Sequence, residues 1–265
     1  MAEVTLPGGN TVGAVLTGDV VRKQASPSTP TVHALLRHLE DAGFDAAPRA
    51  LGIDDQGRQL LSYLPGETVG ARSRWPAWAY TDSMLIQVGR WIRRVHDATA
   101  DFRPPADEQW FIGRAMRPGL IVGHQDAAPY NAAVDGDRLV GFFDWDAAGP
   151  TSREFDLAFS ALLWVPLTAP DEEDAPLRDH DLADRSRRLH LFLDAYGYDG
   201  DRRAFGPVVQ QRARLQGIAI RQMAEAGDPA CIALLPIADR LERSASALEL
   251  LPTAFWALDP AQQID

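Results

Sequence analysis

The stretch LIVGHQDAAPYNAAVDGDRLVGFFDWDAAGPTSREFDLA, residues 120–158, is the most informative part of the sequence. Its apolar beginning leads to Asp126, and Asn131 follows five residues later. The pair Asp135-Gly136 predicts a tight hairpin turn. The second strand of that hairpin runs up to Asp144. The pattern therefore predicts that two carboxylates and one amide lie beside each other at the end of a hairpin.

These residue types fit phosphoryl transfer. The reaction needs a base for the proton of an attacking hydroxyl, and oxygen ligands for the divalent metal on the nucleotide phosphates. Asp126 can serve as the base, while Asn131 and Asp144 supply oxygens of the kind that Mg²⁺ prefers. The alternative is that all three residues only close turns or cap a helix. That interpretation does not explain why three such groups flank one hairpin.

Three segments resemble the catalytic core of the aminoglycoside phosphotransferase family: HQDAAPYN (124–131), FFDWDAAGP (142–150) and FDLA (155–158). This family is related to choline kinase and has a protein-kinase-like fold. The resemblance covers most of the chain and is strongest over residues 120–166. It implies an α+β, bilobal protein-kinase-like fold, with a small antiparallel-sheet N-terminal lobe and a larger, mainly helical C-terminal lobe.

The resemblance also implies roles for single residues. Asp126 would be the catalytic base, and Asn131 and Asp144 would be the metal ligands. His124 is placed with Asp126 in the catalytic set, where it would orient the loop through its own hydrogen bonds. Asp156 resembles the family's buried aspartate that braces the catalytic loop, and it could also cap a helix.

The sequence pattern changes near residues 62–66. Short strands with turns come before this point, and Pro65-Gly66 is typical of a turn between two parts of a chain. We therefore predict an N-terminal nucleotide-binding lobe at 1–64 and a C-terminal catalytic and substrate-binding lobe at 65–265. The nucleotide base is expected at backbone groups of the hinge residues Ser62, Tyr63 and Leu64.

Hydrophobic periodicity and turn residues predict the individual elements. The expected strands cover residues 4–6, 11–16, 20–24, 50–53 and 59–64. The expected helices start at Pro30 and end before Gly43, and then cover residues 80–99, 181–198, 207–226 and 229–251.

The basic residues are 25 arginines and one lysine, Lys23. In kinase-like folds, a basic residue on the third strand of the N-terminal lobe reaches the nucleotide phosphates. Adjacent strand residues face opposite ways, so only one of Arg22 and Lys23 can point into the cleft. We favour Lys23 and keep Arg22 as the alternative.

Two features depart from the family pattern. The helix after this strand lacks the glutamate that would pair with the basic residue. His33 is a candidate substitute, although a lone histidine on a helix is more often structural. The turn Pro7-Gly8-Gly9-Asn10 is shorter than a full glycine-rich phosphate loop and fits a plain hairpin equally well.

Composition excludes some classes of protein. The net charge of −11 argues against nucleic-acid binding and is compatible with a cationic acceptor. An acidic run at 169–174, continued by Asp179, Asp181 and Asp184, is a candidate substrate loop, although a solvated loop is the better interpretation. The seven tryptophans are expected mainly in the core.

We expect a cytoplasmic protein. Cys231 is the single cysteine, so the chain cannot form an internal disulfide. No apolar run is long enough for a membrane span, and the first residues do not read as a signal peptide. The sequence leaves the oligomeric state open.

The function predicted from the sequence is a small-molecule kinase. It would use ATP or GTP with Mg²⁺ and phosphorylate a hydroxyl of an aminoglycoside-like antibiotic or a similar metabolite. The alternative is a nucleotide-binding pseudokinase, or an immunity-type binding protein without turnover. The missing helix glutamate and the sparse glycine turn favour this alternative. The complete set of Asp126, Asn131 and Asp144 argues against it.

Overall fold

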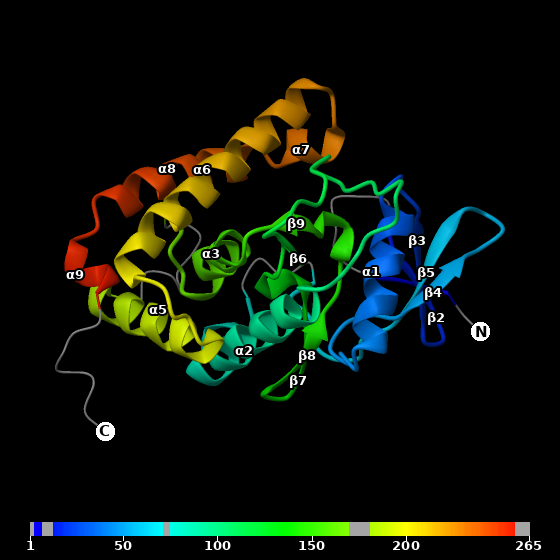
Figure 1. Cartoon of the computed structure of the whole chain (residues 1–265), viewed down its shortest axis with the longest axis horizontal. Helices are drawn as coiled ribbons and strands as arrows, with labels where there is room; N and C mark the ends of the chain where they lie inside the picture. Colours follow the sequence, from blue (N-terminus) through cyan, green and yellow to red (C-terminus); the bar gives the residue numbers. More distant parts are fainter. Residues whose placement is uncertain (1–2, 7–12, 71–74, 170–180, 258–265) are drawn as a thin grey trace.

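The computed structural model describes residues 3–6, 13–70, 75–169 and 181–257. Five antiparallel strands at one end of the molecule form a sheet in the order β1-β2-β3-β5-β4 (Figure 1). They are β1 (Val4–Thr5), β2 (Val15–Thr17), β3 (Val20–Gln24), β4 (Ala50–Ile53) and β5 (Arg58–Ser62).

Helix α1 (Thr29–Asp41) connects β3 to β4 and buries its apolar side. Its predicted start needs a small correction. Ser28 is the N-cap residue but its side chain makes no capping hydrogen bond, and Pro30 is the second helical residue. Instead, the Thr29 hydroxyl accepts from the Ser26 N–H at 2.9 Å. This contact closes the turn that leads into the helix.

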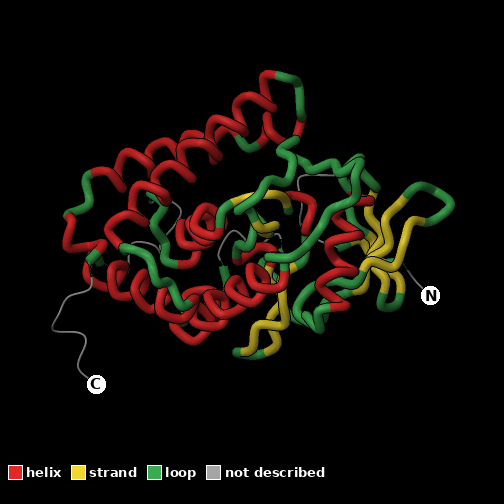
Figure 2. The backbone as a smooth tube through the Cα atoms, viewed as in Figure 1, coloured by secondary structure: helices red, strands yellow, loops and turns green. Residues whose placement is uncertain are grey.

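The remaining described residues form the larger lobe, in which helices predominate (Figure 2). Two short antiparallel pairs, β6–β9 and β7–β8, lie between its helices and the N-terminal sheet (Figure 1). The strands are β6 (Ile121–Gly123), β7 (Ala132–Asp135), β8 (Arg138–Phe142) and β9 (Gly149–Thr151). The α-helices are α2 (Asp82–Ala98), α3 (Arg153–Trp164), α5 (Leu182–Tyr196), α6 (Arg202–Glu225), α7 (Pro229–Ala233), α8 (Leu235–Glu249) and α9 (Thr253–Trp256). The short 3-10 helices are η1 (Ala77–Tyr80), η2 (Pro129–Asn131) and η3 (Trp145–Ala147).

This arrangement confirms the predicted bilobal α+β fold. The boundary between the lobes at residues 62–66 remains our proposal; β5 ends there, at Ser62. Just after it, Glu67 exchanges two backbone hydrogen bonds with Val134 of β7, of 2.7 and 2.9 Å. The chain is therefore held against the second lobe as soon as it leaves the first.

Two predicted helix ranges are wrong in detail. The helix predicted at 207–226 begins at Arg202, because the Asp201 carboxylate caps it by accepting from the Arg203 N–H at 2.9 Å. The helix predicted at 229–251 is two helices, α7 and α8. Pro236 lies in the first turn of α8, where its missing N–H is tolerated, and it cannot continue the hydrogen-bond ladder of α7.

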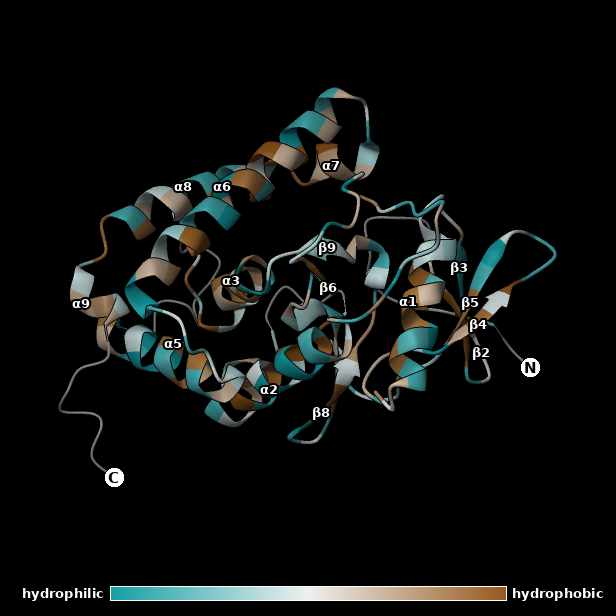
Figure 3. Ribbon diagram, viewed as in Figure 1, coloured by the Kyte–Doolittle hydropathy of each residue, from teal (hydrophilic) through white to brown (hydrophobic). Residues whose placement is uncertain are grey.

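Helix α2 forms the centre of the larger lobe. It buries Leu85, Val88 and Ile92 on one side and contacts α5 and α3. Apolar residues gather on one side of such helices while polar residues cover the other (Figure 3). Six of the seven tryptophans are buried and Trp75 is partly buried, as predicted. Within the described residues no helix is both long and apolar enough to span a membrane.

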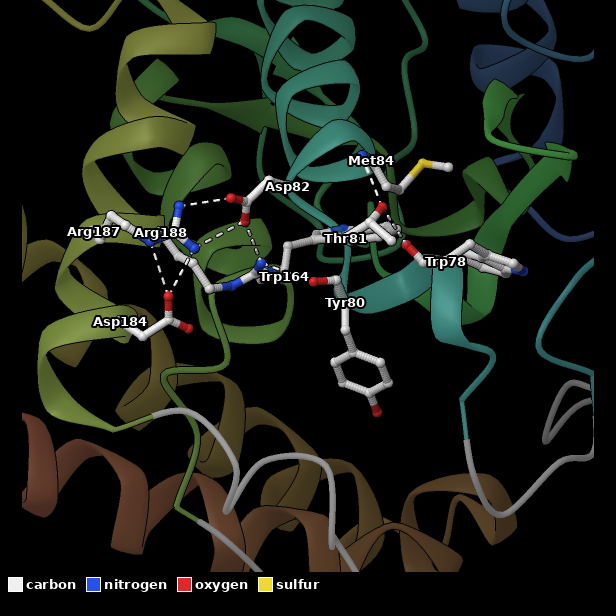
Figure 4. A network of polar contacts seen from close by, with 9 residues as sticks. All are labelled: Trp78, Tyr80, Thr81, Asp82, Met84, Trp164, Asp184, Arg187 and Arg188. Atoms are coloured by element: carbon white, nitrogen blue, oxygen red, sulfur yellow. Dashed lines mark hydrogen bonds and ion pairs between the residues drawn. The ribbon is translucent and has the colours of Figure 1, made fainter.

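Arg188 of α5 is buried, whereas arginines on helices usually lie on exposed faces. Its side chain is 1% exposed. The guanidinium donates to the carbonyl groups of Tyr80 and Trp164, at 2.8 and 2.9 Å, and to Asp82 at 2.9 Å (Figure 4). One buried arginine therefore ties the start of α2 to the end of α3, because both carbonyls need a donor that water cannot supply there.

The contact between α2 and α5 predicts the effect of Gly89→Ala. Alanine favours a helix over glycine by about 1 kcal/mol, but a Cβ at this position would lie 2.9 Å from the Phe192 carbonyl oxygen. We expect the clash to outweigh the helix preference and to lower the midpoint of thermal unfolding. Arg90→Ala, on the exposed side of the same helix, serves as the control and should be near neutral. A raised midpoint for Gly89→Ala would contradict this packing.

Candidate functional site

A buried carboxylate, Asp156 of α3, holds the loop that follows β6. Its two oxygens accept hydrogen bonds from the Gln125 N–H at 2.7 Å and from His96 Nε2 at 2.9 Å. Gly123 allows this close approach, because a Cβ there would lie 2.5 Å from Asp156 Cγ. Burial alone would raise the pKa of Asp156, but the hydrogen bonds from His96 and Gln125 outweigh it and hold that pKa below its usual value.

The sequence does not predict the role of Arg212. Arg212 lies on α6, and its Nη2 donates to the Gln125 carbonyl at 3.0 Å. Its side chain is almost fully buried. The guanidinium also lies over the rings of Phe155 and Phe159, 5.0 and 4.6 Å from their centroids. Burial lowers the pKa of Arg212 to about 10, so the group is still charged at neutral pH.

A second carbonyl of the loop, that of Ala127, is held by side chains of α3. It accepts from Ser160 Oγ at 3.1 Å and from Trp164 Nε1 at 2.9 Å. The backbone of 125–127 is thus fixed by side chains of two helices. These bonds support the left-handed conformation of Gln125, with φ +60°, which is strained for a residue other than glycine.

Asp126 projects from this fixed loop. Its Oδ1 accepts from the Tyr130 hydroxyl at 2.6 Å, and its Oδ2 accepts from Asn131 Nδ2 at 2.8 Å. Burial raises the pKa of Asp126 to about 7; Asp144 adds to the rise, and the two hydrogen bonds oppose it. A carboxylate with such a pKa is suited to accept a proton near neutral pH.

His124 lies beneath the loop and is fully buried. Its Nδ1 accepts from the Asp126 N–H at 3.3 Å, so Nε2 carries the proton and donates to the Phe143 carbonyl at 3.1 Å. Burial lowers the pKa of His124, which fits a neutral ring. The structure therefore places His124 where it can orient Asp126 but cannot touch a substrate.

The end of the hairpin brings Asp144 to Lys23 of β3. Lys23 Nζ lies 2.6 Å from Asp144 Oδ1 and 2.6 Å from Asp146 Oδ2. Burial lowers the pKa of Lys23, but the two aspartates outweigh this effect and raise it. Arg22 belongs to the opposite face of the same strand.

This arrangement shows what pairs with Lys23 in place of a helix glutamate. The partners are Asp144 and Asp146. His33 is buried, and within the described residues its Nε2 makes no hydrogen bond. Asp144 has φ +60°, and among the described residues only it and Gln125 combine a side chain with a positive φ. Both strained residues belong to the candidate site, as is common at functional positions.

Asn131 and Asp144 offer oxygens that suit a divalent cation. Both hydrogen bonds from the Asn131 amide use Nδ2, which leaves its Oδ1 available. No cluster of three or more His, Cys, Asp or Glu side chains is arranged to hold a metal by itself in the part of the chain described. A metal here would therefore take further oxygens from phosphates and water.

Of the hinge residues, Ser62 ends β5, and Tyr63 and Leu64 follow it. The N–H groups of Ser62 and Tyr63 donate to the carbonyls of Arg49 and Asp19, at 3.0 and 2.9 Å. Within the described residues, no backbone carbonyl accepts a hydrogen bond from the Leu64 N–H. Of the three donors, Leu64 is thus the one that a ligand can use without breaking a backbone hydrogen bond.

Two predicted features fall outside the described residues: the turn at 7–10 and most of the acidic run, 170–174, together with Asp179. The remaining acidic residues have structural partners. Asp181 caps α5 through the Asp184 N–H at 2.8 Å. Asp184 pairs with Arg187 at 2.7 Å.

Comparisons with known proteins identify relatives of this chain. The model of the family described as "Phosphotransferase enzyme family" matches residues 112–192. A trifolitoxin immunity protein from Rhizobium leguminosarum bv. trifolii is 34% identical over 209 residues, which cover 74% of each chain.

Solved structures share the fold over nearly the whole chain. A choline/ethanolamine kinase family protein from Mesorhizobium loti has a TM-score of 0.61 and 16% identity, covering 98% of this chain and 93% of its own. An amicoumacin kinase in complex with AMP-PNP, Ca²⁺ and Ami has a TM-score of 0.61 and 12% identity, covering 96% and 88%.

The hydrogen bonds of Asp156 predict a pH-dependent contribution to stability. Its pKa is lower in the folded state, so Asp156 stabilises the fold above the ordinary aspartate pKa and loses this effect as the pH falls through the folded-state value. Asp156→Asn should lower the free energy of unfolding by about 2–3 kcal/mol near neutral pH. The difference from the parent should shrink as the pH falls below the ordinary aspartate pKa and through the lower folded-state value.

Urea unfolding across this pH range checks the prediction. Asp97→Asn is the matched control, since Asp97 pairs with Arg93 and Arg153 but is half exposed. It should cost about 1 kcal/mol or less. Equal losses in the free energy of unfolding for the two variants would contradict a larger stabilising effect of Asp156.

Proposed function

The chain belongs to the phosphotransferase enzyme family, and from this we propose that it transfers the γ-phosphoryl group of ATP or GTP to a hydroxyl of a small molecule. One observation carries the proposal. Asn131 contacts Asp126 on a loop whose backbone is fixed, and Lys23 of β3 contacts Asp144 at the end of the hairpin. Phosphoryl transfer depends mainly on such positioning and on charge stabilisation.

In the proposed mechanism, the acceptor hydroxyl binds beside Asp126. Its oxygen forms a bond to the γ-phosphorus while the bond from that phosphorus to the bridging oxygen of the nucleoside diphosphate breaks. The hydroxyl proton passes to the Asp126 carboxylate. Asn131 holds the carboxylate in place through Nδ2, and the loop bonds keep it from turning away.

Asn131 and Asp144 would hold Mg²⁺, which neutralises charge on the β- and γ-phosphates when bound. Lys23 now sits between Asp144 and Asp146. We propose that nucleotide phosphates compete for its ammonium group, so that Lys23 clamps them while the aspartates are released for the cation. The hinge would hold the base, with Leu64 offering its N–H.

The acceptor class follows from the family and from the relatives. The solved structures of this fold include an amicoumacin kinase, and the 34% identical relative is named for immunity to trifolitoxin. We propose a hydroxylated antibiotic, aminoglycoside-like in its chemistry, or a similar metabolite. The net charge of −11 suits an acceptor that carries positive charge.

A second candidate is an immunity-type protein that binds nucleotide or toxin without turnover. The name of the immunity protein favours it, as does the absence of a helix glutamate beside Lys23. Phosphoryl transfer remains the better proposal, because binding alone gives no reason for Asp126 to be hydrogen-bonded and held on a strained loop.

The catalytic proposal predicts that Asp126→Asn lowers phosphoryl transfer about a thousandfold, since loss of a general base typically has an effect of this size. The assay screens hydroxylated antibiotics and metabolites with Mg²⁺, using ATP and GTP in parallel. Asp135→Asn is the control, because Asp135 lies exposed at the turn of the same hairpin. Transfer that is equally fast in both variants would rule out Asp126 as the base. Nucleotide binding with no transfer to any acceptor would favour the second candidate.

A further inference from the structure

Tyr130 makes a contact that the proposed mechanism does not use. Its hydroxyl donates to Asp126 Oδ1 at 2.6 Å, a short bond typical of a hydroxyl on a charged oxygen. The residue belongs to η2, directly before Asn131, and is 38% exposed. It therefore reaches the carboxylate from the open side of the loop.

The other side-chain hydrogen bonds to Asp126 come from a buried residue. Oδ2 is held by Asn131 at 2.8 Å, and the backbone carbonyl of Asp126 is held by the same amide at 3.0 Å. Behind the loop lie the buried side chains of His124 and Asp156. A hydroxyl that comes from the open side therefore meets Oδ1, where the Tyr130 hydroxyl now lies.

We infer that the Tyr130 hydroxyl occupies the position of the acceptor hydroxyl on Asp126, so that an acceptor must displace it before phosphoryl transfer. The inference rests on the proposed kinase function and adds a residue that controls access to the base. A phenolic hydroxyl donating to the carboxylate is a close chemical mimic of an alcohol in the same place.

The contact gives the resting site a protective function. Water is a small acceptor that can attack a bound nucleotide, and it would use the same base. With Tyr130 on Oδ1, water must compete with the phenolic hydroxyl for this oxygen of Asp126. A larger acceptor gains enough contacts elsewhere in the site to move the side chain, which turns about two torsions while its backbone stays in η2. Hydrolysis is thereby suppressed until an acceptor arrives.

The test measures hydrolysis of Mg-ATP and Mg-GTP by the full chain without any added acceptor. Tyr130→Phe keeps the ring and removes only the hydroxyl. We expect hydrolysis to rise about tenfold, the effect of removing a competing hydrogen bond to a charged group. A variant that merely damages the fold would lose hydrolysis, so the expected gain distinguishes the two.

Tyr198→Phe is the matched control, because its hydroxyl donates to the Glu154 carboxylate, also at 2.6 Å, away from the site. It should leave hydrolysis unchanged. The double variant Tyr130→Phe with Asp126→Asn should lose the gain. Unchanged or slower hydrolysis in Tyr130→Phe would overturn the inference, and so would a gain that persists without Asp126.

The test can contradict the role of Tyr130 without contradicting the proposed kinase function. If the parent chain shows Asp126-dependent transfer to an acceptor but Tyr130→Phe shows no gain in hydrolysis, only the role of Tyr130 is wrong. If neither the parent nor Tyr130→Phe shows any Asp126-dependent reaction, both are wrong. Intact-mass measurement of the same samples completes the test, since a phosphate on Tyr130 would overturn a purely blocking role.

Discussion

The hydrogen bond from the Gln125 N–H to the buried Asp156 carboxylate is the constraint on which the candidate site depends. A buried carboxylate is costly unless its oxygens are satisfied, and here the loop backbone and His96 satisfy them. The same bond holds Gln125 in a conformation that it would otherwise avoid. Asp126 owes its direction to that conformation, because it is the next residue in the chain.

Helix α6 completes this support from the opposite end of the sequence. Arg212 brings a buried positive charge to the Gln125 carbonyl, near both Asp126 and Asp156. The C-terminal helices therefore contribute to the charge balance of the site as well as to the core. Lys23 plays a comparable part on the other lobe, where its ammonium offsets Asp144 and Asp146. Each lobe thus places a cation beside carboxylates of the candidate site.

The sequence predicted the bilobal fold and the strands around the hairpin well, because the signals are local. Apolar runs, an Asp-Gly turn and close spacing along the chain bring Asp126, Asn131 and Asp144 together. The contact of Arg212 with the loop was not predictable in this way, since the two residues it joins are 87 positions apart. Helix α3 and strand β9 were likewise absent from the predicted elements, although they carry Asp156 and pair with β6.

Other differences have equally physical causes. Alternation along β3 narrowed the phosphate-binding residue to Lys23 or Arg22, but only the three-dimensional arrangement shows that Lys23 lies against Asp144. Arg188 is buried although arginines on helices are usually solvated. The carbonyls of Tyr80 in η1 and of Trp164 at the end of α3 make its burial favourable. Contacts between residues far apart in the chain produce no periodic pattern in the sequence.

We propose that Asp144, with Asn131, binds the metal of a nucleotide-dependent phosphotransferase. Calorimetric titration of ATP and GTP, with and without Mg²⁺, tests it most directly when the parent chain is compared with Asp144→Asn. If Asp144 binds the metal, Mg²⁺ should tighten nucleotide binding in the parent and have little effect in the variant. An equal effect of Mg²⁺ in both proteins would contradict it.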